Sequence, residues 1–281
     1  MSRVGRSWEL AKVCMRVLRL DKELMLFPAV SALALLLVSA AFAVPSFFGG
    51  LFSTGDGVTA AQVVVGLSFY FVCYFAIIYF NSALVGAALL RLRGENPTVR
   101  DGFRIASSHL GTIAGYAAIS ATVGLVLRLL RERGGIIGVI GSVVAGMAWS
   151  IATFLAVPVL VVEGVGPVAS IKRSAALLKK TWGEQIVGSA GIGLVFFLFA
   201  LAVAVVGGAL TWLALSSSII PLAVVLGVMT VVIILAISLV GATLHGIFSA
   251  AVYDYAVTGE TGGLVPSELV RDAFRVKTAA V

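Results

Sequence analysis

The chain has 281 residues, of which 60% are hydrophobic and only 12% are charged. A typical soluble domain has about 25% charged residues, so this composition excludes an ordinary soluble enzyme and a disordered chain. Low charge combined with long apolar stretches is typical of an integral membrane protein. The formal net charge is +7. Because the basic residues lie next to apolar segments, this charge favours anionic lipid headgroups over nucleic acid as partners.

Six apolar segments are long enough to cross a bilayer as helices, which takes about 20 residues each. The first is expected to be an uncleaved span rather than a signal peptide, because the charged stretch before it is long. No Asp, Glu, Lys or Arg occurs between Glu184 and Asp254, an interval that suits two spans. Gly207-Gly208 is a candidate kink within it. The expected spans are residues 24–48, 59–90, 110–130, 136–162, 186–215 and 219–252.

Four polar segments are expected to form amphipathic helices on the membrane surface. They are residues 7–23, 96–107, 167–182 and 266–277. In the first segment, Pro28 is expected to separate the surface helix from the following span. Asn96 and Gly166 each precede a proline and are predicted to begin the second and third surface helices.

The apolar faces of these surface helices follow from helical spacing. The face predicted for the first helix comprises Leu10, Val13, Val17, Leu20 and Leu24. The face predicted for the third comprises Ile171, Ala175, Leu178 and Trp182.

The predicted fold class is therefore all-α, a polytopic membrane protein with one membrane domain over residues 1–281. Six transmembrane helices form three hairpins, residues 24–90, 109–162 and 186–252, with the interfacial helices on the cytoplasmic side. Each unit of surface helix and hairpin starts on the same side, as in a parallel repeat. Simple alternation of basic loops and hairpins would produce a similar pattern.

Orientation follows from the distribution of Lys and Arg. With six spans, seventeen of these residues lie on one side and only three, Arg128, Arg131 and Arg133, on the other. This asymmetry predicts that both termini are cytoplasmic. The usage of Ala, Val, Gly and Arg suggests a prokaryote, so the expected location is the cytoplasmic (inner) membrane.

One run of residues suggests a family. The segment from Val157 to Pro167, continuing through Ile171 to Ser174 and Leu178 to Trp182, resembles uncharacterised six-span bacterial and archaeal proteins related to the membrane domain of glycerophosphodiester phosphodiesterases. The run from Trp8 to Pro28 resembles the same group. The resemblance implies a six-helix membrane fold with interfacial helices. It does not imply phosphodiesterase activity, which belongs to a separate soluble barrel domain for which this chain has no room.

No catalytic arrangement emerges from the sequence. The only histidines are His109 and His245, and the carboxylates Glu163 and Asp254 lie at span ends rather than inside the spans. Cys14 and Cys73 are expected at different depths, which argues against a disulfide. We therefore predict no enzymatic activity, no catalytic residue, no metal site and no cofactor.

The basic residues of the surface helices are the strongest functional candidates, as contacts to lipid headgroups or a partner protein; retention of topology alone is the alternative. They are Arg16, Arg19, Arg100, Arg104, Lys172, Arg173, Lys179 and Lys180. On the opposite side, Arg128, Arg131 and Arg133 either snorkel or bind an anionic group. Inside the spans, Asn81 and His245 either mark a functional polar site or form hydrogen bonds between helices.

These observations lead to two functional hypotheses. The first is a non-enzymatic membrane scaffold or accessory subunit that associates with membrane phospholipids, with itself as a homo-oligomer, or with a membrane protein partner. The second is a channel or permease for a small solute or lipid, formed by one chain or by a homo-oligomer. Binding to nucleic acid is not expected.

Overall fold

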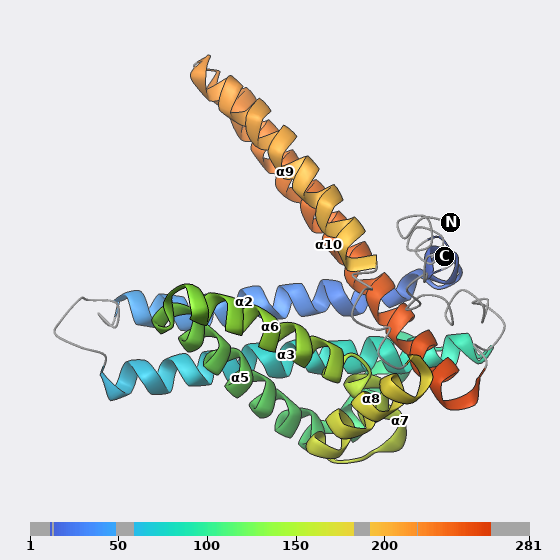
Figure 1. Cartoon of the computed structure of the whole chain (residues 1–281). Helices are drawn as coiled ribbons and strands as arrows, with labels where there is room; N and C mark the ends of the chain where they lie inside the picture. Colours follow the sequence, from blue (N-terminus) through green and yellow to red (C-terminus); the bar gives the residue numbers. More distant parts are fainter. Residues whose placement is uncertain (1–11, 13, 49–58, 183–191, 218, 260–281) are drawn as a thin grey trace, which may run out of the picture.

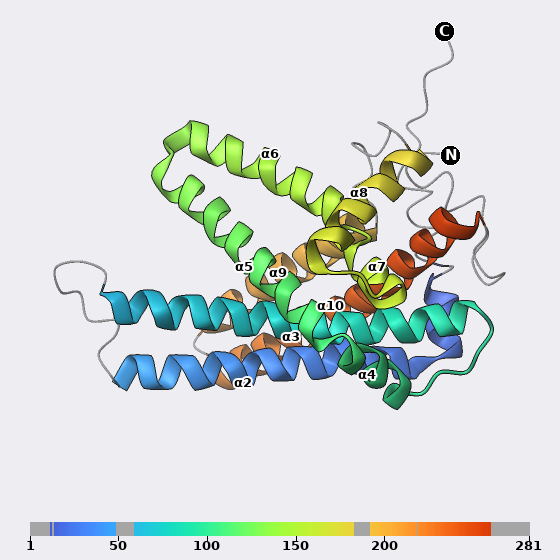
Figure 2. The same ribbon diagram turned by 90° about the horizontal axis from the view of Figure 1, so that it is seen from below.

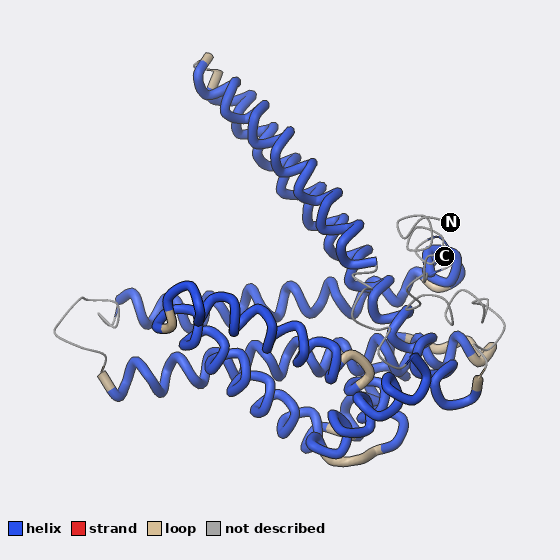
Figure 3. Tube along the Cα trace, viewed as in Figure 1, coloured by secondary structure: helices blue, strands red, loops and turns tan. Residues whose placement is uncertain are grey.

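We describe the chain from a computed structural model, which defines residues 12, 14–48, 59–182, 192–217 and 219–259. In this part of the chain the regular structure is helical throughout (Figure 3). A helix at residues 14–20 is followed by the 3₁₀ helix η1 (Lys22–Met25). The remaining elements are α2 (Leu26–Phe48), α3 (Ala60–Leu92), α4 (Val99–Ser108), α5 (Leu110–Arg133), α6 (Gly135–Thr153), α7 (Ala156–Glu163), α8 (Pro167–Trp182), α9 (Ile192–Ser216) and α10 (Ile220–Thr258).

Six helical segments among the described residues are long and apolar enough to cross a membrane, which agrees with the six predicted spans. They are α2 with η1, α3, α5, α6 continued by α7, α9 and α10. α10 has 39 residues, which corresponds to about 58 Å of helix and exceeds a hydrocarbon core of about 30 Å. Part of α10 must therefore tilt or project beyond that core.

The long helices lie side by side in sequential pairs, α2 with α3, α5 with α6, and α9 with α10 (Figures 1 and 2). The pairs converge at one end of the molecule, where α4, α7 and α8 also lie. From this end, α9 and the first part of α10 extend at a steep angle to the other long helices (Figure 1). We call this shared end the base and define it as residues 14–25, 78–109, 154–180 and 243–258.

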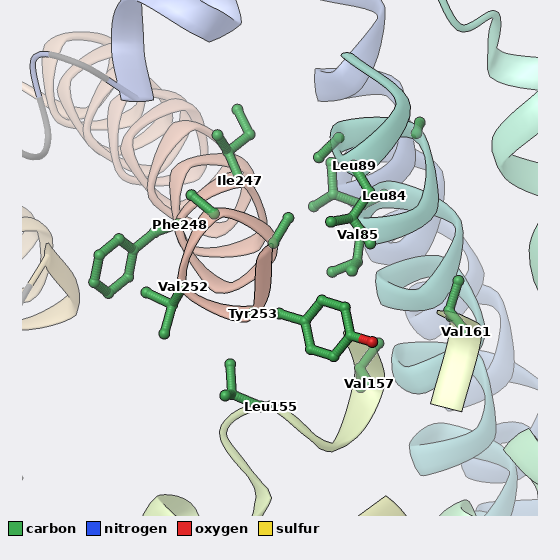
Figure 4. Close-up of a cluster of buried hydrophobic side chains, with 14 of the residues drawn as sticks. Leu84, Val85, Leu89, Leu155, Val157, Val161, Ile247, Phe248, Val252 and Tyr253 are labelled. Atoms are coloured by element: carbon green, nitrogen blue, oxygen red, sulfur yellow. The ribbon is translucent and has the colours of Figure 1, made fainter. Parts of the chain in front are cut away.

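The base contains most of the buried residues, and α3, α7 and α10 meet there (Figure 4). α3 is buried on all sides from Ser82 to Leu89, and α10 is similarly enclosed from Gly246 to Asp254. Glycines permit this close approach, because a Cβ on Gly246 would collide with the Leu84 side chain and one on Gly102 with the Ala83 carbonyl. Small residues at helix contacts replace the hydrophobic driving force that lipid cannot provide.

The break before the first span differs from the prediction. The chain leaves the helical conformation at Asp21, whereas Pro28 lies in the first turn of α2. A proline is tolerated there because a helix does not use the N–H groups of its first turn. Within the predicted apolar face, Val17 and Leu24 are buried, but Leu20 is 55% exposed. Cys14 and Leu18 are buried instead.

The fourth span is interrupted, whereas the sequence predicted one unbroken helix over residues 136–162. α6 ends at Thr153 and α7 begins at Ala156. Pro158 explains the break, since it lacks the N–H that would bond the Phe154 carbonyl within a continuous helix. Ser249 Oγ of α10 donates to that carbonyl at 3.2 Å, and Leu155 N–H donates to Ser174 Oγ of α8 at 3.0 Å.

Two details of the surface helices also differ. Thr98, not Asn96, begins α4, and it forms a reciprocal capping box with Asp101. The spacing Thr-x-x-Asp is the signal for this cap. In α8, which begins at Pro167 as predicted, Ala175 is exposed and Leu178 is buried. The buried face instead includes Ser170 and Ser174.

α9 is one continuous helix from Ile192 to Ser216, so the candidate kink at Gly207-Gly208 does not break it. Gly207 instead allows close contact with α10, since a Cβ there would collide with the Thr230 side chain. Residues 7–11 and 13 of the first surface helix, residues 186–191 of the fifth span and the surface helix predicted at residues 266–277 lie outside the described residues.

Candidate functional site

Charged side chains from α3, α7, α8 and α10 form a network at the base. Arg173 Nε of α8 donates to both carboxylate oxygens of Glu163 at 3.1 and 3.2 Å. The Tyr253 hydroxyl of α10 donates to Glu163 Oε1 at 3.4 Å. Arg93 Nη2, directly after α3, lies 3.4 Å from Asp254 Oδ1. We call these five residues the basal network.

Burial divides the basal network into an inner and an outer side. The side chains of Asp254 and Glu163 are 6% and 24% exposed, whereas those of Arg93 and Arg173 are 46% and 49% exposed. The carboxylates therefore lie toward the protein and the guanidinium groups toward its surroundings. Removing an arginine would leave a largely buried carboxylate without compensation, which is costly. The network thus connects α7 to α8 and α10, and connects the end of α3 to α10.

A second polar contact joins the N-terminal segment to the end of α3. Arg91 Nη1 donates to Asn96 Oδ1 at 2.9 Å, and its Nη2 donates to the Leu20 carbonyl at 3.5 Å. Asp21 is buried beside it, and Asp21 Oδ2 has no hydrogen-bond partner among the described residues. Burial raises the pKa of the Asp21 carboxyl above its ordinary value, although the nearby Arg91 guanidinium acts in the opposite direction. Ionised Asp21 is therefore an unfavourable charge in the folded protein.

Most of the predicted headgroup residues are exposed at the base. Arg16, Arg19, Arg100, Lys172, Lys179 and Lys180 are all exposed. Arg104 Nη2 pairs with Asp101 Oδ1 at 2.6 Å. Thr98 lowers the pKa of Asp101 through hydrogen bonds from its backbone N–H and its hydroxyl. Arg173 alone of the predicted set belongs to the basal network.

Of the predicted outer arginines, Arg128 is held by two side-chain contacts. Arg128 Nε donates to Glu132 Oε1 at 2.7 Å, and Arg128 Nη1 donates to the Tyr70 hydroxyl at 2.7 Å. These bonds connect the outer end of α5 to α3. Arg131 and Arg133, three and five residues further along α5, are exposed. The arrangement favours a local anchoring role for Arg128 over a free anion-binding role.

The intramembrane pair Asn81 and His245 does not converge. Asn81 Oδ1 lies 3.8 Å from the position that a Cβ on Gly246 would occupy, so Asn81 faces α10. His245 is exposed on a different face of α10, and its ring lies 5.7 Å from that of Phe154 in an edge-to-face arrangement. Among the described residues, the structure shows no hydrogen bond between these two side chains.

The cysteines are free thiols. Burial raises the pKa of the Cys14 thiol to about 12, so this group is a poor nucleophile at neutral pH. Among the described residues, no group of three or more His, Cys, Asp and Glu side chains is arranged to hold a metal ion.

The sequence-based reasoning missed Arg93, Glu163, Tyr253 and Asp254 as members of one site. Arg93 contributed only to the orientation count, and the two carboxylates were dismissed because they lie at span ends. Their position in the sequence could have indicated this site. Charged residues at the ends of spans on the same membrane side can meet when the helices converge. Their pairing depends on contacts 10 to 161 residues apart in sequence, which sequence spacing does not encode.

Comparisons with known proteins yield a family match but assign no activity. Residues 60–263 match DUF6159, described as a family of unknown function. Neither the curated proteins nor the solved structures yielded a match. The family match does not connect the chain with glycerophosphodiester phosphodiesterases. Because the matched segment covers more than half of the chain, this protein, with six helices apolar enough to span a membrane, belongs to the DUF6159 family.

Proposed function

We propose that this protein is a non-enzymatic accessory subunit or scaffold of a prokaryotic cytoplasmic membrane, which binds phospholipids and a membrane protein partner through its base. In this proposal the pairs α2–α3, α5–α7 and α9–α10 cross the membrane as hairpins, and both termini are cytoplasmic. The helix at residues 14–20, α4 and α8 lie amphipathically at the cytoplasmic surface. Kinship with the membrane domain of glycerophosphodiester phosphodiesterases, without their hydrolase barrel, fits this role.

The observation that carries the proposal is that four threonine hydroxyls in the spans bond to their own helices, although the buried Ser82 Oγ of α3 has no hydrogen-bond partner among the described residues. Thr122, Thr211, Thr230 and Thr243 each donate a hydrogen bond to the carbonyl four residues earlier in their own helix. Hydroxyls bonded in this way do not need water or a solute inside the membrane. Polar pathways in transporters usually contain ionisable groups facing the bundle interior. Most charged groups of the described residues lie instead at the base, where a headgroup or partner can reach them.

The exposed lysines of α8 provide the most direct support for lipid binding. Lys172, Lys179 and Lys180 are exposed, and each cation near an anionic leaflet contributes roughly 1 kcal/mol. A variant combining Lys179→Gln and Lys180→Gln should retain less phosphatidylglycerol when the protein is extracted with its surrounding lipids. The matched control is Arg131→Gln with Arg133→Gln, which also removes two exposed cations but at the opposite end. Equal lipid loss in both variants would contradict a role for the base.

The deciding experiment is the intact mass of the complex extracted mildly from its own membrane, with lipids and bound proteins retained. We expect either a monomer that carries phospholipids or a stoichiometric complex with a second membrane protein. A closed homo-oligomer that conducts a solute after reconstitution into liposomes would overturn the accessory role in favour of a channel. Asn81→Ala and His245→Ala are then the first variants to test, because loss of flux in them would place these residues on the pathway.

A further inference from the structure

Two arginines of the basal network have the arrangement of an anion-binding pair. Arg173 contacts Glu163 through Nε alone, and Arg93 contacts Asp254 through one Nη2 bond. A guanidinium carries five N–H donors. The other donors of both arginines therefore have no acceptor among the described residues. Both groups are about half exposed, so these donors are accessible from outside the protein.

The arginines are also held in place before any ligand arrives. Glu163 and Asp254 bind them from the protein side, which fixes the direction in which the unused donors point. Such preorganisation reduces the entropy lost on binding. The planar guanidinium fork matches the geometry of phosphate oxygens and can bind them in a bidentate manner.

Tyr253 brings the two arginines into one site. Its side chain extends from α10 toward α3 and α7 (Figure 4). Its hydroxyl bonds Glu163 and lies within electrostatic range of both Arg93 and Arg173. Because Tyr253 and Asp254 are consecutive, the α10 backbone fixes the spacing between the Glu163–Arg173 and Asp254–Arg93 pairs. The four charged residues come from four elements. Contacts link Glu163 to Arg173 and Tyr253, and link Asp254, the next residue of α10, to Arg93.

The position of the site suggests the depth of its ligand. Arg93 follows the last turn of α3, and Asp254 lies in the last turns of α10, so both are at the ends of membrane-spanning helices. Basic pockets at this depth bind anionic headgroups. The two ion pairs are formally neutral, but their carboxylates lie inward and their guanidinium groups outward. The neighbouring Lys172 adds an exposed positive charge beside Arg173.

We infer that Arg93 and Arg173 form a binding site for one phosphate monoester or diester, held between the two guanidinium groups at the base of the molecule. This inference rests on the proposed membrane function and adds to it a specific, saturable ligand site, distinct from general attraction of lipid to exposed lysines. The same phosphate chemistry has two sources, the headgroup of an anionic phospholipid and a free phosphate in the cytoplasm.

The test uses the unmodified full-length protein in lipid nanodiscs and the arginine-specific reagent phenylglyoxal, with the modification of each arginine followed by peptide mass spectrometry. One sample contains phosphatidylglycerol in digalactosyldiacylglycerol, one contains digalactosyldiacylglycerol alone, which is a bilayer lipid without phosphate, and one contains digalactosyldiacylglycerol with added inorganic phosphate. We expect phosphate ligation to slow modification of Arg93 and Arg173 about tenfold relative to Arg100 and Arg104 in the same sample. If phosphatidylglycerol protects the two arginines and inorganic phosphate does not, the ligand is a lipid headgroup. If inorganic phosphate also protects them, the site is open to free phosphate.

Equal modification of Arg93 and Arg173 in all three samples, or protection no greater than that of Arg100 and Arg104, would overturn the inference. A second measurement uses Arg93→Lys with Arg173→Lys, which keeps the charges and their carboxylate partners but removes the fork. This variant should lose the single tightly retained phosphatidylglycerol per chain, whereas Arg100→Lys with Arg104→Lys should keep it. If the phosphate site does not exist, the intact-mass experiment still detects the partner protein. This result distinguishes failure of the phosphate inference from failure of the proposed function.

Discussion

Two aspartates at the base contribute to stability with opposite signs. Asp21 is buried with an unbonded oxygen, and burial raises its pKa. Asp101 accepts hydrogen bonds from Thr98, and they lower its pKa. A raised carboxyl pKa favours the folded state below the ordinary value, and this contribution is lost as the pH rises through the folded-state pKa. A lowered pKa gives stability above the ordinary value, which is lost as the pH falls through the folded-state pKa.

We therefore expect Asp21→Asn to raise the unfolding temperature in detergent at pH 8, with the gain shrinking as the pH falls toward 4. Asp101→Asn is the matched control and should lower the unfolding temperature at pH 8, because it weakens the α4 cap, with the loss shrinking at the lowest accessible pH. Thermal unfolding of both variants across this pH range measures the effect. The same sign of change in both variants would show that the assignment of their environments is wrong.

The interruption of the fourth span depends on two serine hydroxyls from other elements. Ser174→Ala would leave the buried Leu155 N–H without its acceptor, at a cost of about 1–3 kcal/mol. Ser142→Ala is the control, because Ser142 Oγ bonds only the Val139 carbonyl of its own helix. We expect a lower unfolding temperature and faster amide exchange at Leu155 for Ser174→Ala. No change in exchange at Leu155 would contradict the proposed role of Ser174.

At the scale of elements, the small residues determine which helices approach closely. α9 contacts α10 at Gly207 and Thr230, and α3 contacts α10 at Leu84 and Gly246. Sequence alone favoured a kink at Gly207-Gly208, because glycine is common at bends. The structure shows that the pair contains two different environments. Gly207 faces the partner helix, whereas a Cβ on Gly208 would meet no atom within 4 Å.

This difference provides a prediction with a built-in control. Gly207→Ala should destabilise the α9–α10 pair by about 1–3 kcal/mol, because the added methyl collides with the Thr230 side chain. Gly208→Ala should be neutral or stabilising by up to about 1 kcal/mol, because alanine has the higher helix propensity. Unfolding temperatures of the two variants in the same detergent measure the effect. Equal destabilisation would instead indicate that both glycines are needed for a bend.

At the scale of the whole molecule, α10 links two different environments. Its last third is enclosed in the base, while its first part contacts mainly α9 and exposes large apolar side chains such as Val225 and Val232. In water such exposure would promote aggregation, but lipid chains solvate these side chains well. The molecule therefore consists of one packed end, with spanning helices that extend from it and present apolar surface to the membrane.

The orientation proposed for this architecture can be tested by labelling single cysteines from each side of the membrane. In a variant with Cys14 and Cys73 replaced by serine, Lys179→Cys should react with an impermeant maleimide only from the cytoplasmic side. Arg131→Cys should react only from the opposite side, because the two positions lie at opposite ends of the spanning helices. Reaction of both positions from one side would contradict the six-span topology, and reversed labelling would contradict the cytoplasmic termini.

The sequence by itself determined the all-helical class and the six apolar helices. Both follow from local composition, since a helix that crosses lipid must be apolar along about 20 residues. It also identified the start of α8 at Pro167, because a proline at a first helical turn is a local signal. The break in the fourth span has a local cause, Pro158. The hydrogen bonds that stabilise the break come from far along the chain, because Ser174 Oγ accepts from Leu155 N–H and Ser249 Oγ donates to the Phe154 carbonyl.

Only the tertiary structure decided which charges meet. Arg93 and Asp254 are separated by 161 residues, and their contact depends on how α3 and α10 converge. Likewise, the sequence left open whether Arg128 snorkels or binds an anionic group, and only the fold brings Tyr70, on a different helix, within hydrogen-bonding distance of it. Composition and periodicity describe the faces of individual helices, whereas the rotation and crossing of helices follow from packing among small residues in three dimensions. For this reason the sequence defined the elements, and the candidate binding site emerged only from their assembly.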